Sequence, residues 1–342
     1  MKKIIYYITD HGLGHATRAV ALIRELQSLN YEIIVRTSIN ENFIQKSLSR
    51  IKIQSGITDV GPTINDDGMS IDVTKSKPNI EKWIEEIPKI ACKEIDFLKK
   101  TNPSLVISDI SAMPFFATKR LNITSLAISN FSWYDGLKFL SSEHLNSLKN
   151  FYDYADYAIK LPFGTPMKHF KNRIETGILT RKPTSSELEI REKFGLNKQD
   201  FVITIALGNS KKSLFFDFGN NCKIISFDKN IKTDSALIQL DNWIEGQDII
   251  SISNLVICKC GYGLISECVT NGIPFYYVYD TEHLEQKSIS DELNSKNIGN
   301  VISLKNTEPN YFSMQSINKL QFPPKEKIDN KNIVNTINEL LN

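Results

Sequence analysis

Two stretches of the sequence carry side chains whose types and spacing could do chemistry, and each follows an apolar run. Residues 12–15 (GLGH) come after the apolar residues 4–8, and residues 259–263 (KCGYG) come after 255–258. A histidine can take up a proton near neutral pH. A lysine beside glycines, whose backbone N–H groups a ligand can approach closely, can hold an anion. Together the stretches suggest one site for proton transfer and one for an anionic group.

The pattern around Lys259 predicts a strand, a glycine turn and a helix. The apolar run stops at Lys259, Gly261 and Gly263 follow, and apolar residues then recur at helical spacing over 264–269. The N-terminus of a helix carries partial positive charge, so this turn favours an anion. Glycine turns after strands are also common for steric reasons alone, and the turn by itself leaves ligand binding open.

The N-terminal pattern predicts a β-α-β unit. Residues 4–8 are expected to form a buried strand, 19–29 have apolar residues at helical spacing, and 31–37 form a second strand. The glycine turn then lies at the carboxyl end of the first strand, where open parallel sheets bind ligands. It lacks the third glycine of the dinucleotide-binding fingerprint. The placement of His15 at this edge favours a functional histidine, the alternative being a histidine that caps or packs on the helix.

Asp109 follows another apolar run, residues 105–107, and is expected at the same edge of the sheet as His15. A carboxylate there can hydrogen-bond one ring nitrogen of His15, orient the ring and stabilise the imidazolium that forms on proton capture. The alternative is that Asp109 caps the helix expected over 113–121. The sequence leaves both interpretations open.

A run of aromatic and polar residues, NFSWYD at 130–135, follows the next expected strand. Aromatic rings with polar neighbours at a strand end suit stacking on an acceptor sugar. Asn130 and Trp133, with Arg18 from the first helix, are therefore candidate acceptor contacts, and packing of the loop is the alternative. Exposed apolar side chains over 131–140 would allow contact with a membrane lipid, which core packing explains as well.

Taken in order, these stretches resemble the motifs of nucleotide-sugar glycosyltransferases of GT-B fold, and look closest to the glycosyltransferase-like N-terminal half of L-arabinokinases. No sugar-kinase half follows, so kinase activity is not expected. The resemblance implies that His15 is the base, that Lys259 and its turn contact the donor diphosphate, that Glu267 holds the ribose, and that the 285–286 pair reads the sugar. Family members often carry His where Lys259 stands, and the run to that pair is about two residues longer here.

The expected second domain opens with a strand over 201–206, which ends at a loop. In the resembled family this loop is a Gly-Gly-Ser-type turn facing the donor phosphates, and Gly208 is its one glycine here. Lys211 and Lys212 either compensate for the missing glycine or form an ordinary solvated pair. The predicted donor contacts are Gly14, Gly208, Asn209, Ser210, Lys259, Gly261, Tyr262, Gly263, Glu267, Glu285 and Gln286.

Length and composition fit a soluble two-domain protein. The 342 residues suffice for two cores. The 41 Lys and Arg nearly balance the 39 Asp and Glu, and a net charge of +2 argues against a general nucleic-acid or membrane-surface role. The five scattered cysteines are expected to be reduced thiols, and no apolar run is long enough to span a membrane. We expect a cytoplasmic protein, with contact to the inner membrane face left open.

These patterns predict an α/β protein with two doubly wound Rossmann-like domains facing across a cleft, the GT-B fold. Residues 1–170 would bind the acceptor and 171–342 the nucleotide-sugar donor, and a terminal helix over 330–341 would pack back on the first domain. No Asp-x-Asp pair ends a strand, since Asp66-Asp67 is assigned to a loop turn. Neither a metal nor a cofactor is therefore expected.

The predicted activity is inverting transfer of a hexosyl or N-acetylhexosaminyl group from a UDP-sugar to a hydroxyl acceptor. The acceptor would be a glycan, a lipid-linked sugar or a small molecule, and His15, assisted by Asp109, would take its proton. One alternative is a nucleotide-sugar hydrolase or epimerase of the same fold. The other is a non-catalytic protein that binds a nucleotide sugar.

Overall fold

The computed structural model describes residues 2–68, 70–208, 214–216, 218, 222–240, 245–302 and 323–341. The chain divides into two compact units. The first comprises Met1–Thr63, Ile71–Thr180 and Ile328–Asn342, and the second comprises Ile64–Ser70 and Arg181–Lys327. The junction therefore follows Thr180 rather than residue 170. Residues 64–70 belong to the second unit, although nothing in the sequence marks them.

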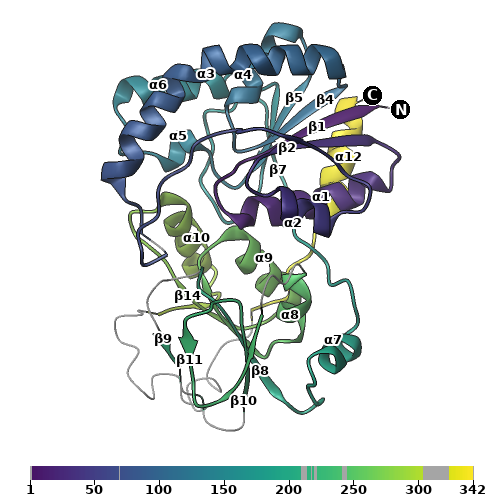
Figure 1. Ribbon diagram of the computed structural model, residues 1–342, viewed down its shortest axis with the longest axis vertical. Helices are drawn as coiled ribbons and strands as arrows, with labels where there is room; N and C mark the ends of the chain where they lie inside the picture. The colour runs from purple at the N-terminus through teal and green to yellow at the C-terminus, as the bar shows by residue number, and fades with distance from the viewer. Residues whose placement is uncertain are drawn as a thin grey trace. The chain divides into compact units, whose positions relative to one another are not determined.

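The first unit contains a seven-stranded parallel sheet with helices on both faces (Figure 1). In spatial order its strands are β3 (Lys52–Ser55), β2 (Glu32–Thr37), β1 (Lys3–Ile8), β4 (Leu105–Asp109), β5 (Ser125–Ser129), β6 (Tyr157–Lys160) and β7 (Arg173–Glu175). Strands β4 and β5 are buried along their whole length. That burial is typical of parallel strands covered on both sides, and it explains their near-continuous apolar sequences.

Two layers of helices enclose this sheet. One layer contains α3 (Val73–Thr101), α4 (Met113–Leu121) and α6 (Ser142–Tyr152), and the other contains α1 (Leu13–Gln27), α2 (Glu41–Ser47) and α12 (Asn330–Leu341), while α5 (Trp133–Gly136) is a single turn. Ile5 and Val106 of the sheet pack in one core with Ile84 and Phe115 of the first layer. Helix α3 continues through Pro88.

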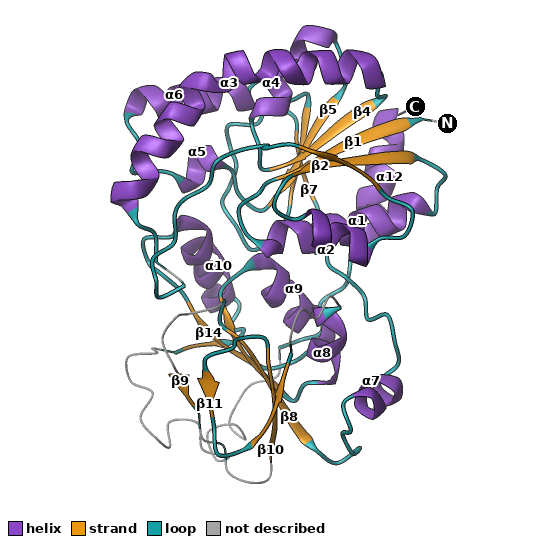
Figure 2. Cartoon of the chain, in the orientation of Figure 1, coloured by secondary structure: helices purple, strands orange, loops and turns teal. Residues whose placement is uncertain are grey.

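The second unit is built on a six-stranded parallel sheet (Figure 2). In spatial order its strands are β12 (Ala236–Gln239), β10 (Cys222–Ser226), β8 (Phe201–Ala206), β13 (Leu255–Lys259), β14 (Phe275–Val278) and β15 (Asn300–Val301). Strands β9 (Leu214–Phe215) and β11 (Ile231–Lys232) form a small separate sheet. The helices of this unit are α7 (Glu187–Lys193), α8 (Gly246–Ile252), α9 (Tyr262–Asn271) and α10 (Leu284–Ser295). Alternate residues of β8 enter different cores: Ile203 packs in one, and Val202 packs with Ile190 and Ile249 in the other. Both faces are therefore covered, which confirms two doubly wound α/β units.

Each sheet has one point at which the order of its strands reverses. The first unit builds outward from β1 through β2 to β3 and then places β4 on the other side of β1, and the second does the same with β13 beside β8. Open sheets bind ligands outside the carboxyl ends of strands at such a point. The register sets Asp109 opposite Ile8 in the first sheet and Cys258 opposite Ala206 in the second. Both motif stretches therefore lie at reversal points.

Candidate functional site

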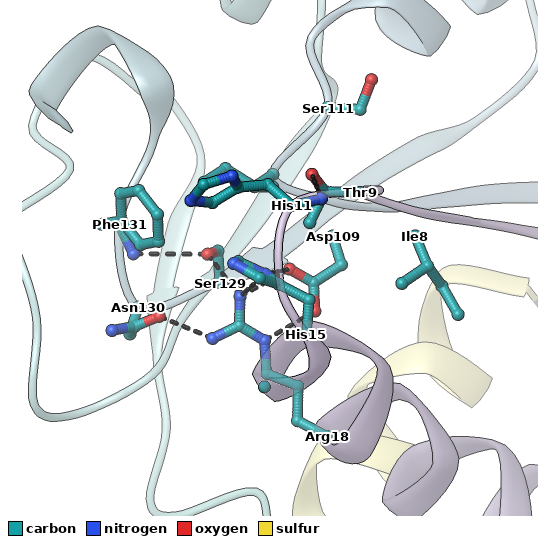
Figure 3. Close-up of polar contacts among 12 residues, drawn as sticks. Ile8, Thr9, His11, His15, Arg18, Asp109, Ser111, Ser129, Asn130 and Phe131 are labelled. Carbon is teal, nitrogen blue, oxygen red and sulfur yellow. Dashed lines mark hydrogen bonds and ion pairs between the residues drawn. The ribbon is translucent and has the colours of Figure 1, made fainter. Parts of the chain in front are cut away.

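His15 and Asp109 meet at the reversal point of the first sheet. After β1 the chain turns at Gly12, whose φ of 82° suits glycine, and α1 begins at once, so His15 lies in its first turn. Asp109 is the last residue of β4. His15 Nδ1 lies 2.7 Å from Asp109 Oδ1, and both side chains are buried (Figure 3). The residue before α4 is Ala112, so Asp109 does not cap that helix.

Arg18 lies one turn of α1 beyond His15 and faces the same carboxylate. Its Nε donates to Asp109 Oδ2 at 2.6 Å and its Nη2 donates to Oδ1 at 2.5 Å, and the side chain is 1% exposed. Figure 3 shows the guanidinium reaching from α1 to Asp109 and to the end of β5. The charge of Arg18 neutralises a buried acid, and its contact with an acceptor stays a prediction.

The other two expected acceptor contacts are also buried. Asn130 accepts from Arg18 Nη1 at 2.5 Å and donates to the carbonyl oxygen of Phe163 at 3.0 Å. Trp133 donates its ring N–H to Asp59 Oδ2 at 2.8 Å. Both side chains hold loops at the sheet edge, and their contact with an acceptor stays a prediction. Phe131 is buried beside them, and Leu137 and Leu140 are buried as well, so core packing accounts for the apolar stretch that suggested a lipid contact.

The electrostatics favour an ionised Asp109. Burial by itself raises the pKa of this carboxyl, but the positive charge of Arg18 and the neighbouring His15 more than offset it, and its pKa lies below the ordinary value. A charged Asp109 can accept from His15 Nδ1–H and stabilise an imidazolium. The pair therefore has the geometry and the charge of a base with its orienting acid.

Two acids at this edge escaped the sequence analysis. Asp59 accepts from the hydroxyl of Thr9 at 2.7 Å as well as from Trp133, and burial raises its pKa against those hydrogen bonds. Asp10 accepts from the backbone N–H groups of Ser38 and Ile39 after β2. Each acid follows a strand closely, β3 or β1, and that placement at the carboxyl edge could have identified them.

The second reversal point gathers several of the predicted donor contacts. Lys259 ends β13, and its ammonium donates to the carbonyl oxygen of Gly68 at 2.9 Å. Gly208 lies against Lys259, since a Cβ built on Gly208 would stand 3.4 Å from Lys259 Cδ. Gly261 precedes α9, and a Cβ there would meet nothing within 4 Å. Burial lowers the pKa of Lys259, against the opposing charges of Glu285 and Asp67.

Glu267 lies on α9 and is paired with an arginine that the sequence analysis did not single out. Arg181 donates from Nε and from Nη2 to Glu267 Oε1, both at 2.9 Å. Burial raises the pKa of Glu267, Arg181 opposes the rise, and Glu245 and Asp248 add to it. The carboxyl group is thus held in place in surroundings that make its charge costly.

The remaining residues that were predicted to contact the donor differ in their burial and in their contacts. Gln286 is buried and accepts from the backbone N–H of Asp280 at 3.0 Å, so it shapes the loop before α10. The ring of Tyr262 is 2% exposed and belongs to the core. A Cβ on Gly14 would meet nothing within 4 Å, and Gly263 lies in the first turn of α9. Asn209 and Ser210 lie outside the described residues.

Two properties concern the described ranges as a whole. Among the residues that the structure describes, no group of three or more His, Cys, Asp or Glu side chains is placed to hold a metal ion. None of the described helices is both long enough and apolar enough to cross a lipid bilayer.

Sequence comparison relates the chain to part of a longer protein. No family model matches the sequence. The chain is 26% identical over 291 residues to L-arabinokinase from Arabidopsis thaliana. The alignment covers 80% of this chain but only 28% of the relative, so the chain spans little more than a quarter of that protein. This agrees with the resemblance to L-arabinokinases.

Solved structures show which fold this is. MurG from Acinetobacter baumannii superposes with a TM-score of 0.60 at 12% identity, covering 99% of this chain and all of the other. Spinosyn forosaminyltransferase SpnP gives 0.61 at 11% identity with 99% of each chain covered. UGT89C1 from Arabidopsis thaliana, complexed with UDP-L-rhamnose, gives 0.59 at 10% identity, covering 88% and 84%. The chain has the GT-B fold of nucleotide-sugar glycosyltransferases.

Proposed function

We propose that the protein is an inverting, metal-independent glycosyltransferase that moves a hexosyl or N-acetylhexosaminyl group from a nucleotide-diphosphate sugar to a hydroxyl acceptor. The observation that carries the proposal is the contact of 2.7 Å between His15 and Asp109 at the reversal point of the first sheet. A buried histidine with an ionised acid at Nδ1 is suited to take a proton at Nε2. The GT-B fold supplies the reaction class.

In the proposed step, the acceptor oxygen attacks the anomeric carbon while His15 Nε2 takes the hydroxyl proton. The bond between that carbon and the diphosphate oxygen breaks, and the electron pair leaves with the diphosphate. One displacement inverts the configuration. Lys259 and the N-terminus of α9 would stabilise the departing negative charge, so the step needs no metal ion.

The second unit is the proposed donor site. Lys259 and the Gly261–Gly263 turn would contact the diphosphate, Glu267 would bind the ribose hydroxyls, and Glu285 with Gln286 would read the sugar. UDP is the proposed nucleotide, and the UDP-L-rhamnose complex of UGT89C1 supports it by analogy. The cytoplasm is the proposed compartment, because the closely spaced Cys258 and Cys260 are buried thiols.

In the first unit, side chains that the sequence did not single out would also contribute to acceptor binding. Exposed aliphatic side chains follow three neighbouring strands at the edge near His15: Leu13, 51% exposed, Ile39, 74%, and Ile57, 58%. Burying them would favour a hydroxylated acceptor with an apolar portion. Ile39→Ser and Ile57→Ser should raise KM for such an acceptor without changing kcat, whereas Leu188→Ser, an exposed site in the second unit, should change neither.

The proposal is tested first by a thermal-shift titration with UDP, GDP, TDP and their common sugars, on the wild type and on Glu267→Ala. A ligand at a hundredfold excess over its Kd stabilises the folded state by about 2.7 kcal/mol. One nucleotide should stabilise the wild type, and the variant should lose most of that gain. No shift with any nucleotide would overturn the donor site.

Product analysis separates the remaining functions. With the stabilising donor and an acceptor, the wild type should form a glycoside, and His15→Gln should bind the donor without turnover. Free sugar and nucleotide in the absence of acceptor would indicate a hydrolase. Donor binding with no turnover under any acceptor would indicate a non-catalytic binding protein.

A further inference from the structure

The Arg18 guanidinium contacts side chains from three elements at once. Its Nη2 alone lies within hydrogen-bonding distance of Asp109 Oδ1 at 2.5 Å, Ser129 Oγ at 2.9 Å and His15 Nδ1 at 2.6 Å (Figure 3). Ser129 is the last residue of β5 and is 1% exposed. Nη2 carries two hydrogens and cannot accept one. Three neighbouring acceptors therefore compete for two hydrogens.

The charge on Asp109 decides where the first hydrogen goes, because a carboxylate forms the strongest of the three bonds. The second goes either to Ser129 Oγ or to His15 Nδ1. If it went to His15, Nδ1 would carry a lone pair, which would face the Asp109 Oδ1 lone pairs at 2.7 Å and be repelled. The second hydrogen therefore goes to Ser129, and Nδ1 keeps a hydrogen of its own to donate to Asp109.

The Oγ of Ser129 is held in a fixed position in which it can accept a hydrogen bond from Arg18. Its Oγ also accepts from the backbone N–H of Phe131 at 3.3 Å, and a hydroxyl oxygen has two lone pairs for these two donors. This backbone contact fixes the oxygen at the end of β5. Its position is thus set by the fold and not by the state of His15.

We propose that Ser129 is a positioning residue: by accepting the second Nη2 hydrogen of Arg18, it lets His15 keep its hydrogen on Nδ1 for Asp109 and leaves Nε2 bare. The catalytic consequence rests on the proposed function, because a base must present an unprotonated nitrogen to the acceptor hydroxyl. The tautomer itself is a property of the resting protein. It can therefore be measured without donor, acceptor or turnover.

The deciding experiment is a long-range ¹H–¹⁵N correlation spectrum of the ¹⁵N-labelled protein at mildly alkaline pH, where an ordinary histidine is neutral. His15→Gln assigns the ring signals. The wild type should show Nε2 as the unprotonated, pyridine-like nitrogen and Nδ1 as the protonated one. A protonated Nε2 would overturn the proposal, whatever the variants do.

Ser129→Ala tests the mechanism by removing the oxygen. The second Nη2 hydrogen then has His15 Nδ1 as an acceptor 2.6 Å away, so the ¹⁵N signals should shift toward the tautomer with hydrogen on Nε2. The kcat should fall about tenfold or more with little change in KM, because less of the enzyme has a usable base. Unchanged ¹⁵N signals in this variant would overturn the role of Ser129.

Ser125→Ala is the matched control. Ser125 is the first residue of the same strand, is equally buried, and donates to an acid, Asp156, at 2.9 Å. It should leave the His15 signals and kcat as in the wild type, and a shift as large as that of Ser129→Ala would show a general effect of loosening β5. If the protein turns over no substrate, the proposed function fails while the ¹⁵N measurement still decides the tautomer.

Discussion

Asp109 in the first unit and Glu267 in the second are buried carboxylates that each lie beside an arginine, yet their pKa values move in opposite directions. Asp109 and Glu267 are 0% and 2% exposed, so burial penalises the charge of both. The pKa of Asp109 is lowered because Arg18 and His15 outweigh burial. The pKa of Glu267 is raised because Arg181 does not outweigh it. The surrounding charges, and not the extent of burial, decide the direction in which each carboxyl pKa moves.

The difference matches the two proposed roles. An acid that orients a catalytic base must remain ionised while the base gains its proton, and Asp109 has a permanent cation for this purpose. A carboxyl group whose charge is costly gains from new hydrogen-bond donors, and ribose hydroxyls are such donors. Glu267 is thus suited to binding, and Asp109 to catalysis.

The largest expected effect separates the two acids by activity. Asp109→Asn should lower kcat by about 10²–10⁴-fold, because the amide no longer holds His15 in the basic tautomer. Glu267→Gln should keep most of kcat at saturating donor and raise the donor KM by about tenfold, as expected when a charged hydrogen-bond acceptor is lost. Steady-state kinetics with a varied donor distinguishes the two. A larger loss of kcat in the Glu267 variant would reverse the proposed roles.

Stability at neutral pH should follow the same order. Asp109→Asn leaves the buried Arg18 without its counter-ion and should cost about 3–5 kcal/mol in the free energy of unfolding. Glu267→Gln replaces a charge that burial already disfavours and should cost only about 1 kcal/mol. Urea denaturation at pH 7 measures both. Equal costs would mean that the two carboxylates are equally well compensated.

The dependence of stability on pH should also differ between the units. Because the pKa of Glu267 is raised above 4.5 in the folded protein, its contribution is fully present below the unfolded value and is lost as pH rises through the folded one. Asp109 behaves oppositely, since its lowered pKa gives stability above the unfolded value of 3.8 that is lost as pH falls through the folded one. The stability of Glu267→Gln, measured by urea denaturation, should therefore improve relative to that of the wild type as pH rises above 4.5. A pH-independent difference would contradict the raised pKa.

The positions of the reactive groups and the pairing of His15 with Asp109 could be predicted from the sequence, but the arginine partners of the two acids could not. Buried runs such as 105–107 and 255–258, each followed by a polar residue, place Asp109 and Lys259 at strand ends, because parallel strands share a carboxyl edge. The arginine partners come from far along the chain: 91 residues separate Arg18 from Asp109, and 86 separate Arg181 from Glu267. No local spacing encodes such a pair.

The same limit applies to the acceptor contacts that the sequence predicts. Asn130 and Trp133 stand at a strand end where ligand-binding side chains are common, and their residue types suit a sugar. Whether such a side chain faces a ligand or its own core depends on its buried partners. Here those partners are Arg18 and Asp59, which come from other elements of the sheet edge. The sequence pattern places these side chains at the sheet edge but does not show whether they face a ligand or the protein core.

The smallest expected effects come from replacing each of the two arginines by lysine. Lysine keeps the charge but cannot donate from two forked nitrogens, so Arg18→Lys loses contacts with Asp109, Asn130 and Ser129 together. Arg181→Lys can retain one bond to Glu267 Oε1 and should cost about 1 kcal/mol. Native-state hydrogen exchange of β4 and α9 amides reports each unit separately. Amide exchange should quicken more in β4 of Arg18→Lys than in α9 of Arg181→Lys. The reverse order would mean that the second unit depends on its arginine more than the first unit does.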